Sequence, residues 1–269
     1  MPRAARAGYD THWTTFGQGP REAVAIHCSL SHSGSWGGIA RHVSGALTLT
    51  AFDMPGHGRS APWQGEGEIQ EETAKIAATF CEGGACDLIG HSFGATVALR
   101  LAVTRPELVR SLILIEPVFF AVAFADDPTA KARFDAAMGG YARAVEAGDD
   151  MAAAEAFTAL WGDGTAWQDI PRAHRAAMAD QMYLIAAGQP ALYEDVGGML
   201  QPGVLAGVTQ PVLLMEGNQS PDIVPAINEG LAKRLPRAER TIIAGAGHMA
   251  PMTHARQVGA EVLRFFQWA

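Results

Sequence analysis

Residues 86–104, CDLIGHSFGATVALRLAVT, contain the feature that decides the fold. The first four residues form a short apolar run typical of a buried strand, and residues 93–104 repeat apolar side chains with helical spacing. Between the two, GHSFG at residues 90–94 matches the pattern Gly-x-Ser-x-Gly. So tight a turn strains the serine backbone, and side chains at either glycine position would clash. The stretch therefore predicts that the Ser92 hydroxyl projects from the carboxyl edge of a sheet, beside a helix N-terminus that favours negative charge.

Strand-like runs recur on both sides of this stretch and alternate with helical patterns. Such alternation implies right-handed crossovers and a mainly parallel sheet that is covered by helices on both faces. Helical patterns are also predicted at residues 223–235 and, from the apolar spacing of residues 258–266, at the end of the chain. The predicted strands are Val24–Cys28, Leu47–Phe52, Cys86–Ile89, Val109–Ile115, Val212–Met215 and Thr241–Ile243.

The alternation stops between residues 121 and 206, where the chain is rich in alanine and has helical patterns but no strand pattern. We therefore predict two parts: an α/β core formed by residues 1–120 and 207–269, and an all-helical cap, residues 121–206, that sits on the sheet. Apolar stripes are expected at 134, 138, 141 and 145 and at 178, 182 and 185. Helix breakers are expected at residues 148–150, 161–164, 170–171 and 188–190.

Composition excludes several classes of protein. The 269 residues include 20 Lys and Arg against 28 Asp and Glu, a net charge of 20 − 28 = −8, which argues against binding to a nucleic-acid backbone. No signal peptide or membrane-spanning run is evident. Cys28, Cys81 and Cys86 are expected to be reduced thiols of a cytoplasmic protein. We expect a small-molecule substrate, no nucleic-acid or membrane partner, and no metal or organic cofactor; the oligomeric state cannot be read.

Three further segments follow strand patterns: HCSLSHSGSW at residues 27–36, DMPGHGRS at 53–60 and GAGHM at 245–249. Together with GHSFG, they make the chain resemble the α/β-hydrolase superfamily, in its serine-nucleophile branch with a helical cap. The resemblance implies an α/β-hydrolase fold in which Ser92 is the nucleophile and His248 is the general base. An imidazole suits both proton transfers because its pKa lies close to neutral pH.

The same resemblance implies an oxyanion hole formed by two backbone N–H groups, those of Ser29 and Phe93. Cys28 stands where the family has a glycine in this loop. His27, His57 and His91 are expected to fix turns and loops.

The acid that orients His248 is left open by the sequence. The family acid usually follows the seventh strand, but the expected position holds Ser220, and Asp222 stands two residues later. Glu116, at the end of the 109–115 strand, is an equal candidate because some superfamily members take their acid from this strand end. Glu216 is a third candidate.

The expected reaction is cleavage of a small to medium, largely apolar carboxylic ester, lactone or thioester through an acyl intermediate on Ser92. Two alternatives remain open: a carbon–carbon bond hydrolase, for which Arg172 and Arg175 would bind an acidic substrate, and a receptor-like protein with little turnover. The side chains expected to line the substrate pocket are Trp36, Phe119, Phe120, Trp161 and Met249.

Overall fold

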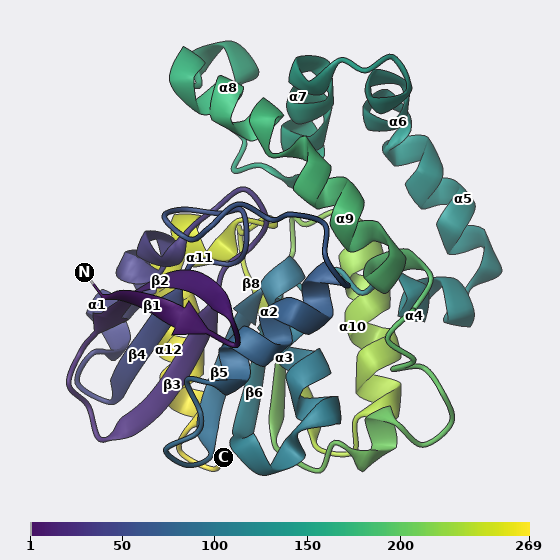
Figure 1. The fold of residues 1–269 in the computed structure, drawn as a ribbon. Coiled ribbons are helices and arrows are strands. Elements are labelled where there is room, and N and C mark those ends of the chain that lie inside the picture. Colours follow the sequence, from purple (N-terminus) through teal and green to yellow (C-terminus); the bar gives the residue numbers. More distant parts are fainter. Residues whose placement is uncertain (1) are drawn as a thin grey trace.

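The computed structural model describes residues 2–269, which form an eight-stranded sheet in the order β1-β2-β4-β3-β5-β6-β7-β8. Strands β3 to β8 are parallel, whereas β1 and β2 are antiparallel and occupy one edge (Figure 1). This arrangement confirms the predicted α/β-hydrolase fold. The strands are β1 (Arg3–Arg6), β2 (Tyr9–Phe16), β3 (Arg21–Ile26), β4 (Leu47–Phe52), β5 (Cys86–His91), β6 (Val109–Ile115), β7 (Val212–Gly217) and β8 (Ala238–Ile243).

Helices cover both faces of this sheet, and a separate apolar core lies on each face. One core includes side chains of α2 (Ile69–Ala78), α3 (Phe93–Thr104) and α10 (Ile223–Arg234). The other includes side chains of α1 (Gly37–Val43) and α12 (Ala255–Phe265). The predicted helices after Ser92, before residue 235 and at the end of the chain are therefore confirmed. Short helical segments complete the core: η1 (Ser33–Trp36), η2 (Pro106–Leu108), η4 (Leu205–Gly207) and α11 (Ala250–Thr253).

All six predicted strands are present, but the antiparallel pair β1 and β2 was missed. The two strands carry arginines, threonines and a histidine, β1 is mostly exposed and β2 is only partly buried, so neither forms a continuous apolar run. β1 is the edge strand of the sheet, and polar side chains on an edge strand discourage pairing with another molecule. The central parallel strands, such as β5 and β7, are buried on both faces and were recognisable for that reason.

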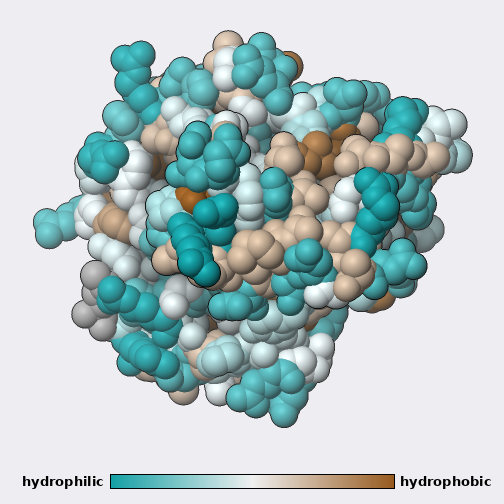
Figure 2. All heavy atoms as spheres, turned by 90° about the horizontal axis from the view of Figure 1, so that it is seen from above, coloured by the Kyte–Doolittle hydropathy of each residue, from teal (hydrophilic) through white to brown (hydrophobic). Residues whose placement is uncertain are grey.

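A helical insert separates β6 from β7, and Figure 1 shows it, in teal to green, above one edge of the sheet. Figure 2 views the molecule from this side and shows mostly hydrophilic residues, with the most hydrophobic ones visible only in small areas. Within the insert, Phe134, Tyr141, Trp161 and Met182 are buried, whereas Val145, Met151, Tyr183 and Val196 are exposed. Its segments are α4 (Phe120–Asp126), α5 (Pro128–Ala137), α6 (Gly139–Glu146), α7 (Asp150–Trp161), η3 (Trp167–Asp169), α8 (Arg172–Asp180) and α9 (Met182–Tyr193).

Two local predictions for the insert were wrong. The break expected at residues 188–190 is absent, because α9 continues through Pro190. Burial of Leu184, Gly188 and Leu192 along this helix offsets the backbone hydrogen bond that a proline removes. The stripe expected to run from residue 134 to 145 is divided between α5 and α6, and Val145 is 46% exposed.

The expectation of three reduced thiols was also wrong. Cys81 and Cys86 form a disulfide across the turn between α2 and β5, where their Cα atoms lie 5.6 Å apart. Cys28 is free and buried. Among residues 2–269, no helix has both the length and the apolar character that crossing a bilayer requires.

Candidate active site

Ser92 lies in the sharp turn between β5 and α3 and has an unusual backbone conformation, with φ of 56° and ψ of −118°. A Cβ at Gly94 would lie 2.2 Å from the carbonyl oxygen of Ile26, and one at Gly90 would lie 2.4 Å from Cα of Ala95. Only glycine fits either position, as the sequence pattern predicted. The turn is also tied to the sheet, because the backbone N–H of Ser92 donates to the carbonyl of Ile115 over 2.9 Å.

The hydroxyl of Ser92 is hydrogen-bonded to His248, which lies in the loop after β8. The distance from Ser92 Oγ to His248 Nε2 is 2.9 Å, and His248 Nδ1 lies 3.2 Å from Oε2 of Glu116. All three side chains are buried, and Glu116 is completely inaccessible. The structure therefore brings together a hydroxyl, an imidazole and a carboxylate from three separate segments.

Glu116 is held by groups from the loop after β7. Its Oε1 accepts hydrogen bonds from the backbone N–H of Gly217 over 2.5 Å and from Ser220 Oγ over 2.7 Å. Ser220 occupies the position where the family resemblance placed an acid. The serine thus takes a supporting position and donates to a carboxylate supplied by the neighbouring strand.

The other two candidate acids lie elsewhere. Asp222 is exposed and precedes α10, so the structure places Glu116 rather than Asp222 beside His248. Glu216 is buried but bonded to Arg240, with 2.9 Å between its Oε1 and the guanidinium, and to the amide of Asn228 over 2.6 Å. The side chain of Glu216 is at the end of β7, yet its oxygens are occupied by this arginine and amide.

Ser29 and Phe93, the expected oxyanion donors, line one cavity together with Ser92. The loop that includes Ser29 is fixed by His27, whose Nδ1–H donates to the carbonyl of Cys28 over 2.7 Å and whose Nε2 accepts from the backbone N–H of Met54 over 3.0 Å. Burial lowers the pKa of His27 to about 3, so the ring is neutral, as this pair of bonds requires. Burial also raises the pKa of the Cys28 thiol to about 12, which removes it as a thiolate nucleophile at neutral pH.

His91 holds the loop that carries His248. Its Nε2–H donates to the backbone carbonyl of His248 over 2.9 Å, and burial lowers the pKa of His91 to about 3. His57 is likewise buried and neutral, with its Nδ1–H donated to the carbonyl of Pro55 over 2.9 Å and its pKa lowered to about 4 by burial. The three histidines expected to be structural therefore all make backbone contacts that fix loops near Ser92.

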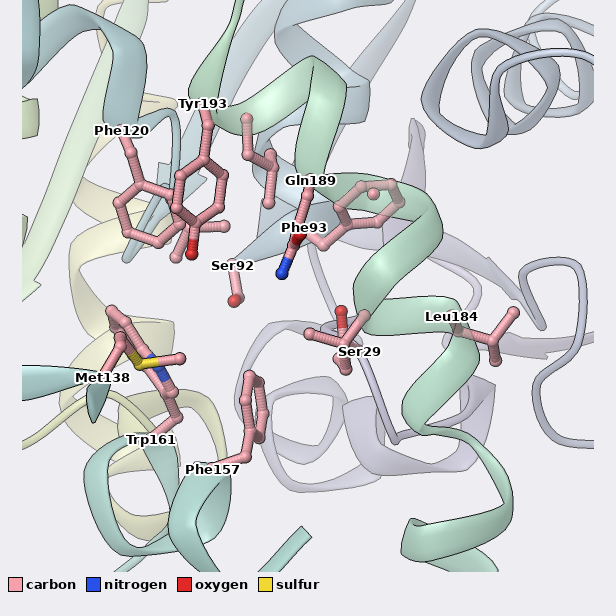
Figure 3. Close-up of a pocket in the computed structure, with 14 residues that line it drawn as sticks. Ser29, Ser92, Phe93, Phe120, Met138, Phe157, Trp161, Leu184, Gln189 and Tyr193 are labelled. Atoms are coloured by element: carbon pink, nitrogen blue, oxygen red, sulfur yellow. The ribbon is translucent and has the colours of Figure 1, made fainter. Parts of the chain in front are cut away.

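The cavity beside Ser92 lies between the core and the helical insert (Figure 3). The indole of Trp161 meets His248 edge-on with ring centroids 4.6 Å apart, so the insert directly covers the imidazole. The lining has no charged side chain and is mostly apolar. Its members are Ser29, Ser92, Phe93, Val118, Phe120, Met138, Phe157, Trp161, Leu184, Ile185, Gly188, Gln189, Leu192 and Tyr193.

Two of the five expected pocket residues, Phe120 and Trp161, line this cavity, and three do not. Trp36 is buried in the core on the α1 and α12 face of the sheet, because η1 turns its side chain inward. Phe119 is completely buried in the opposite core. Met249 lines a separate hollow, which His248 also borders.

The sequence did not single out several lining residues from the insert, among them Met138, Phe157, Gln189 and Tyr193. Their identity depends on how α5, α7 and α9 pack over the sheet, and helical spacing alone does not reveal that packing. The only indication in the sequence that the insert lines a pocket was its content of aromatic residues and methionines. Within residues 2–269, no group of three His, Cys, Asp or Glu side chains is placed as metal ligands would be.

Comparison with known proteins identifies the family of the chain. A profile described as "Alpha/beta hydrolase family" matches residues 23–261. The chain is 29% identical over 250 residues to a pimeloyl-[acyl-carrier protein] methyl ester esterase of Nitrosomonas europaea. The aligned region covers 88% of this chain and 92% of the esterase. It is 35% identical over 111 residues to the lipase LipV of Mycobacterium tuberculosis, 40% of this chain and 42% of the lipase, so the match spans less than half of that protein.

Among solved structures, the fold is similar to MGS-M2, an alpha/beta hydrolase enzyme from a Medee basin deep-sea metagenome library. The TM-score is 0.75 at 17% identity, and the alignment covers 100% of this chain and 98% of the other. At this identity the likeness concerns the fold alone.

Proposed function

The chain belongs to the alpha/beta hydrolase family, and from this premise we propose that it is a serine hydrolase that cleaves small to medium, uncharged carboxylic esters or lactones. The observation that carries the proposal is the continuous hydrogen-bonded line from Ser92 through His248 to Glu116. A nucleophile bonded to a base, which is bonded in turn to an orienting acid, is the arrangement that acyl transfer to serine requires.

In the proposed reaction, Ser92 Oγ attacks the ester carbonyl carbon while its proton passes to Nε2 of His248. The carbonyl oxygen becomes negatively charged and accepts hydrogen bonds from the backbone N–H groups of Phe93 and Ser29. The imidazolium is stabilised by Glu116 and returns the proton to the departing alcohol, which leaves an acyl ester on Ser92. Water then repeats the sequence: it gives a proton to His248, attacks the acyl carbon and releases the acid.

The lining of the cavity supports an uncharged substrate. A carbon–carbon bond hydrolase that acts on acidic products would need cationic side chains beside Ser92, but Arg172 and Arg175 are absent from the lining, and Arg175 lies over the ring of Trp167 instead. The receptor-like alternative was based on the serine, Ser220, at the usual acid position. The carboxylate of Glu116, which lies beside His248, supports an enzyme instead. The names of the relatives, a lipase and a methyl ester esterase, point to ester substrates as well.

The helical insert, residues 121–206, is proposed to act as a cap that shapes and dries the site. The contact between Trp161 and His248 supports this role, because removing water strengthens the electrostatic interactions on which the reaction depends.

Hydrolysis of p-nitrophenyl acetate and butyrate tests the proposal, with Ser92→Ala as the matched control. In the wild type we expect either a burst of p-nitrophenol equal to the enzyme concentration or steady turnover. In Ser92→Ala the rate of hydrolysis should fall by at least about 10⁴-fold. A fluorophosphonate probe should label Ser92 in the wild type, as located by peptide mass spectrometry. Release of p-nitrophenol that is unchanged in Ser92→Ala would contradict the proposal.

A further inference from the structure

Two polar side chains project from one helix into an otherwise apolar cavity. Gln189 and Tyr193 are four residues apart on α9, so they lie on the same face of the helix. Both line the cavity beside Ser92, and Figure 3 shows the amide of Gln189 and the hydroxyl of Tyr193 directed toward the side where Ser92 lies. Neither is accounted for by the proposed hydrolysis, which uses Ser92, His248, Glu116 and two backbone N–H groups.

Within residues 2–269, neither side chain forms a hydrogen bond to another protein group, and the polar atoms of both remain accessible to solvent. Both are half-buried, and their neighbours in the cavity are carbon and sulfur atoms of residues such as Phe120, Met138 and Leu192. An alkyl chain that entered the cavity would displace the water at these groups and leave them without partners, which is unfavourable. Side chains of this kind that converge in a pocket usually supply the few polar contacts that fix a ligand.

The phenol of Tyr193 is held in place before any ligand arrives. Its ring lies against Phe120, with centroids 4.9 Å apart, and against Phe134 and Phe124 at 5.8 and 6.2 Å. Burial raises the pKa of Tyr193, so the hydroxyl stays protonated and acts as a hydrogen-bond donor. The amide of Gln189 offers both a donor and an acceptor.

The cavity suits the acyl part of a substrate better than the alcohol. Ser92 and both expected oxyanion donors line it, and these are the groups that hold the acyl carbon and its oxygen. His248, which must reach the departing alcohol, is not part of this lining but borders a different hollow. A polar atom bound by Gln189 and Tyr193 is therefore an atom of the acyl chain.

We propose that Gln189 and Tyr193 are specificity-determining residues that select acyl groups carrying an oxygen, as a ketone or hydroxyl, beyond the ester carbonyl. The inference rests on the proposed function, since it names the substrate class of the same site. Two hydrogen bonds to such an oxygen would satisfy both side chains at once, whereas a plain alkyl chain would bury them without partners. The remaining lining, which is apolar, accommodates the carbon chain.

Matched pairs of p-nitrophenyl esters test this proposal: 4-oxopentanoate against 4-methylpentanoate, and 5-oxohexanoate against 5-methylhexanoate. Each pair exchanges a ketone oxygen for a methyl group, and the two rates are corrected for their reactivity toward hydroxide. We expect wild-type kcat/KM to favour an oxo ester by about tenfold or more in at least one pair. Tyr193→Phe and Gln189→Met should each reduce that ratio by about five- to tenfold.

Tyr183→Phe is the matched control, because Tyr183 is a tyrosine of the same helix that is 46% exposed and outside the cavity. It should keep the wild-type ratio. The inference alone would be overturned if hydrolysis depended on Ser92 but the ratio of oxo to methyl ester rates were the same in wild type, Tyr193→Phe and Gln189→Met. An equal loss of rate on both esters of each pair would overturn it as well. Absence of Ser92-dependent hydrolysis of every ester would overturn the proposed function together with it.

Discussion

Nδ1 of His248 lies 3.2 Å from Oε2 of Glu116, a carboxylate at the end of β6 rather than in the loop after β7. The loop after β7 still contributes to the site, because Gly217 and Ser220 both donate to the other oxygen of Glu116. The acid and its support therefore come from adjacent strands.

Glu116→Gln should lower kcat by about 10³–10⁴-fold. The glutamine oxygen can still accept from Gly217 and Ser220, so its NH₂ group faces His248 and donates to Nδ1. The remaining imidazole proton is then forced onto Nε2, where it prevents the ring from accepting the proton of Ser92. Steady-state hydrolysis of p-nitrophenyl butyrate measures the change. Asp222→Asn is the matched control and should retain activity within a few-fold; the opposite ranking would assign the orienting role to Asp222.

Ser220→Ala should lower kcat by about tenfold. The variant removes the 2.7 Å hydrogen bond to Oε1 of Glu116, and a hydrogen bond to a charged group is worth roughly 1.5–3 kcal/mol. Ser220→Thr keeps a hydroxyl and should restore most of the activity, which separates the loss of this donor from a general disturbance of the loop. Equal kcat values for wild type and Ser220→Ala would show that Gly217 alone suffices.

The sheet and the Ser92 turn could be predicted from sequence because both depend on local rules. Buried parallel strands such as β6 and β7 appear as short apolar runs, and the backbone contacts at Gly90 and Gly94 leave only glycine at these positions. The pairing of Ser92 with His248 followed from the family resemblance rather than from periodicity. Local patterns and recognised motifs were therefore sufficient to predict the nucleophile and its base.

The acid and the pocket depended on packing between distant segments. Glu116, Asp222 and Glu216 are all carboxylates near strand ends, and only the path of the loop after β7 distinguishes them. Trp36 and Phe119 were misplaced because an aromatic residue after a strand can turn toward either the core or the cavity. The spacing of residues in the sequence does not show which of the two directions such a side chain takes.

Acid should destabilise the protein well before its carboxylates are protonated. An unfolded histidine has a pKa near 6.5, whereas burial lowers the pKa of His57 to about 4 and of His91 to about 3. The stability associated with these rings is complete above pH 6.5 and declines as pH falls toward the folded values, because only the unfolded chain takes up protons. Each ring contributes a slope of about 1.4 kcal/mol per pH unit.

Urea unfolding between pH 6.5 and 4.5 measures this slope. His57→Gln should reduce it by about one proton, because that ring no longer titrates on unfolding. His91→Asn should have a similar effect on the slope. If the free energy of unfolding changed equally with pH in wild type and in both variants, the histidines would not be neutral in the folded protein.

Gly94→Ala should lower the free energy of unfolding by at least about 2 kcal/mol and abolish labelling of Ser92. The new Cβ would lie 2.2 Å from the carbonyl oxygen of Ile26, a backbone atom of β3 that cannot move without disturbing the sheet. Gly207→Ala is the matched control, since nothing lies within 4 Å of a Cβ there. Urea denaturation and fluorophosphonate labelling of both variants provide the measurements. Equal stability of the two variants would show that the turn at Ser92 can relax, because α3 would then have moved away from β3 without loss of the fold.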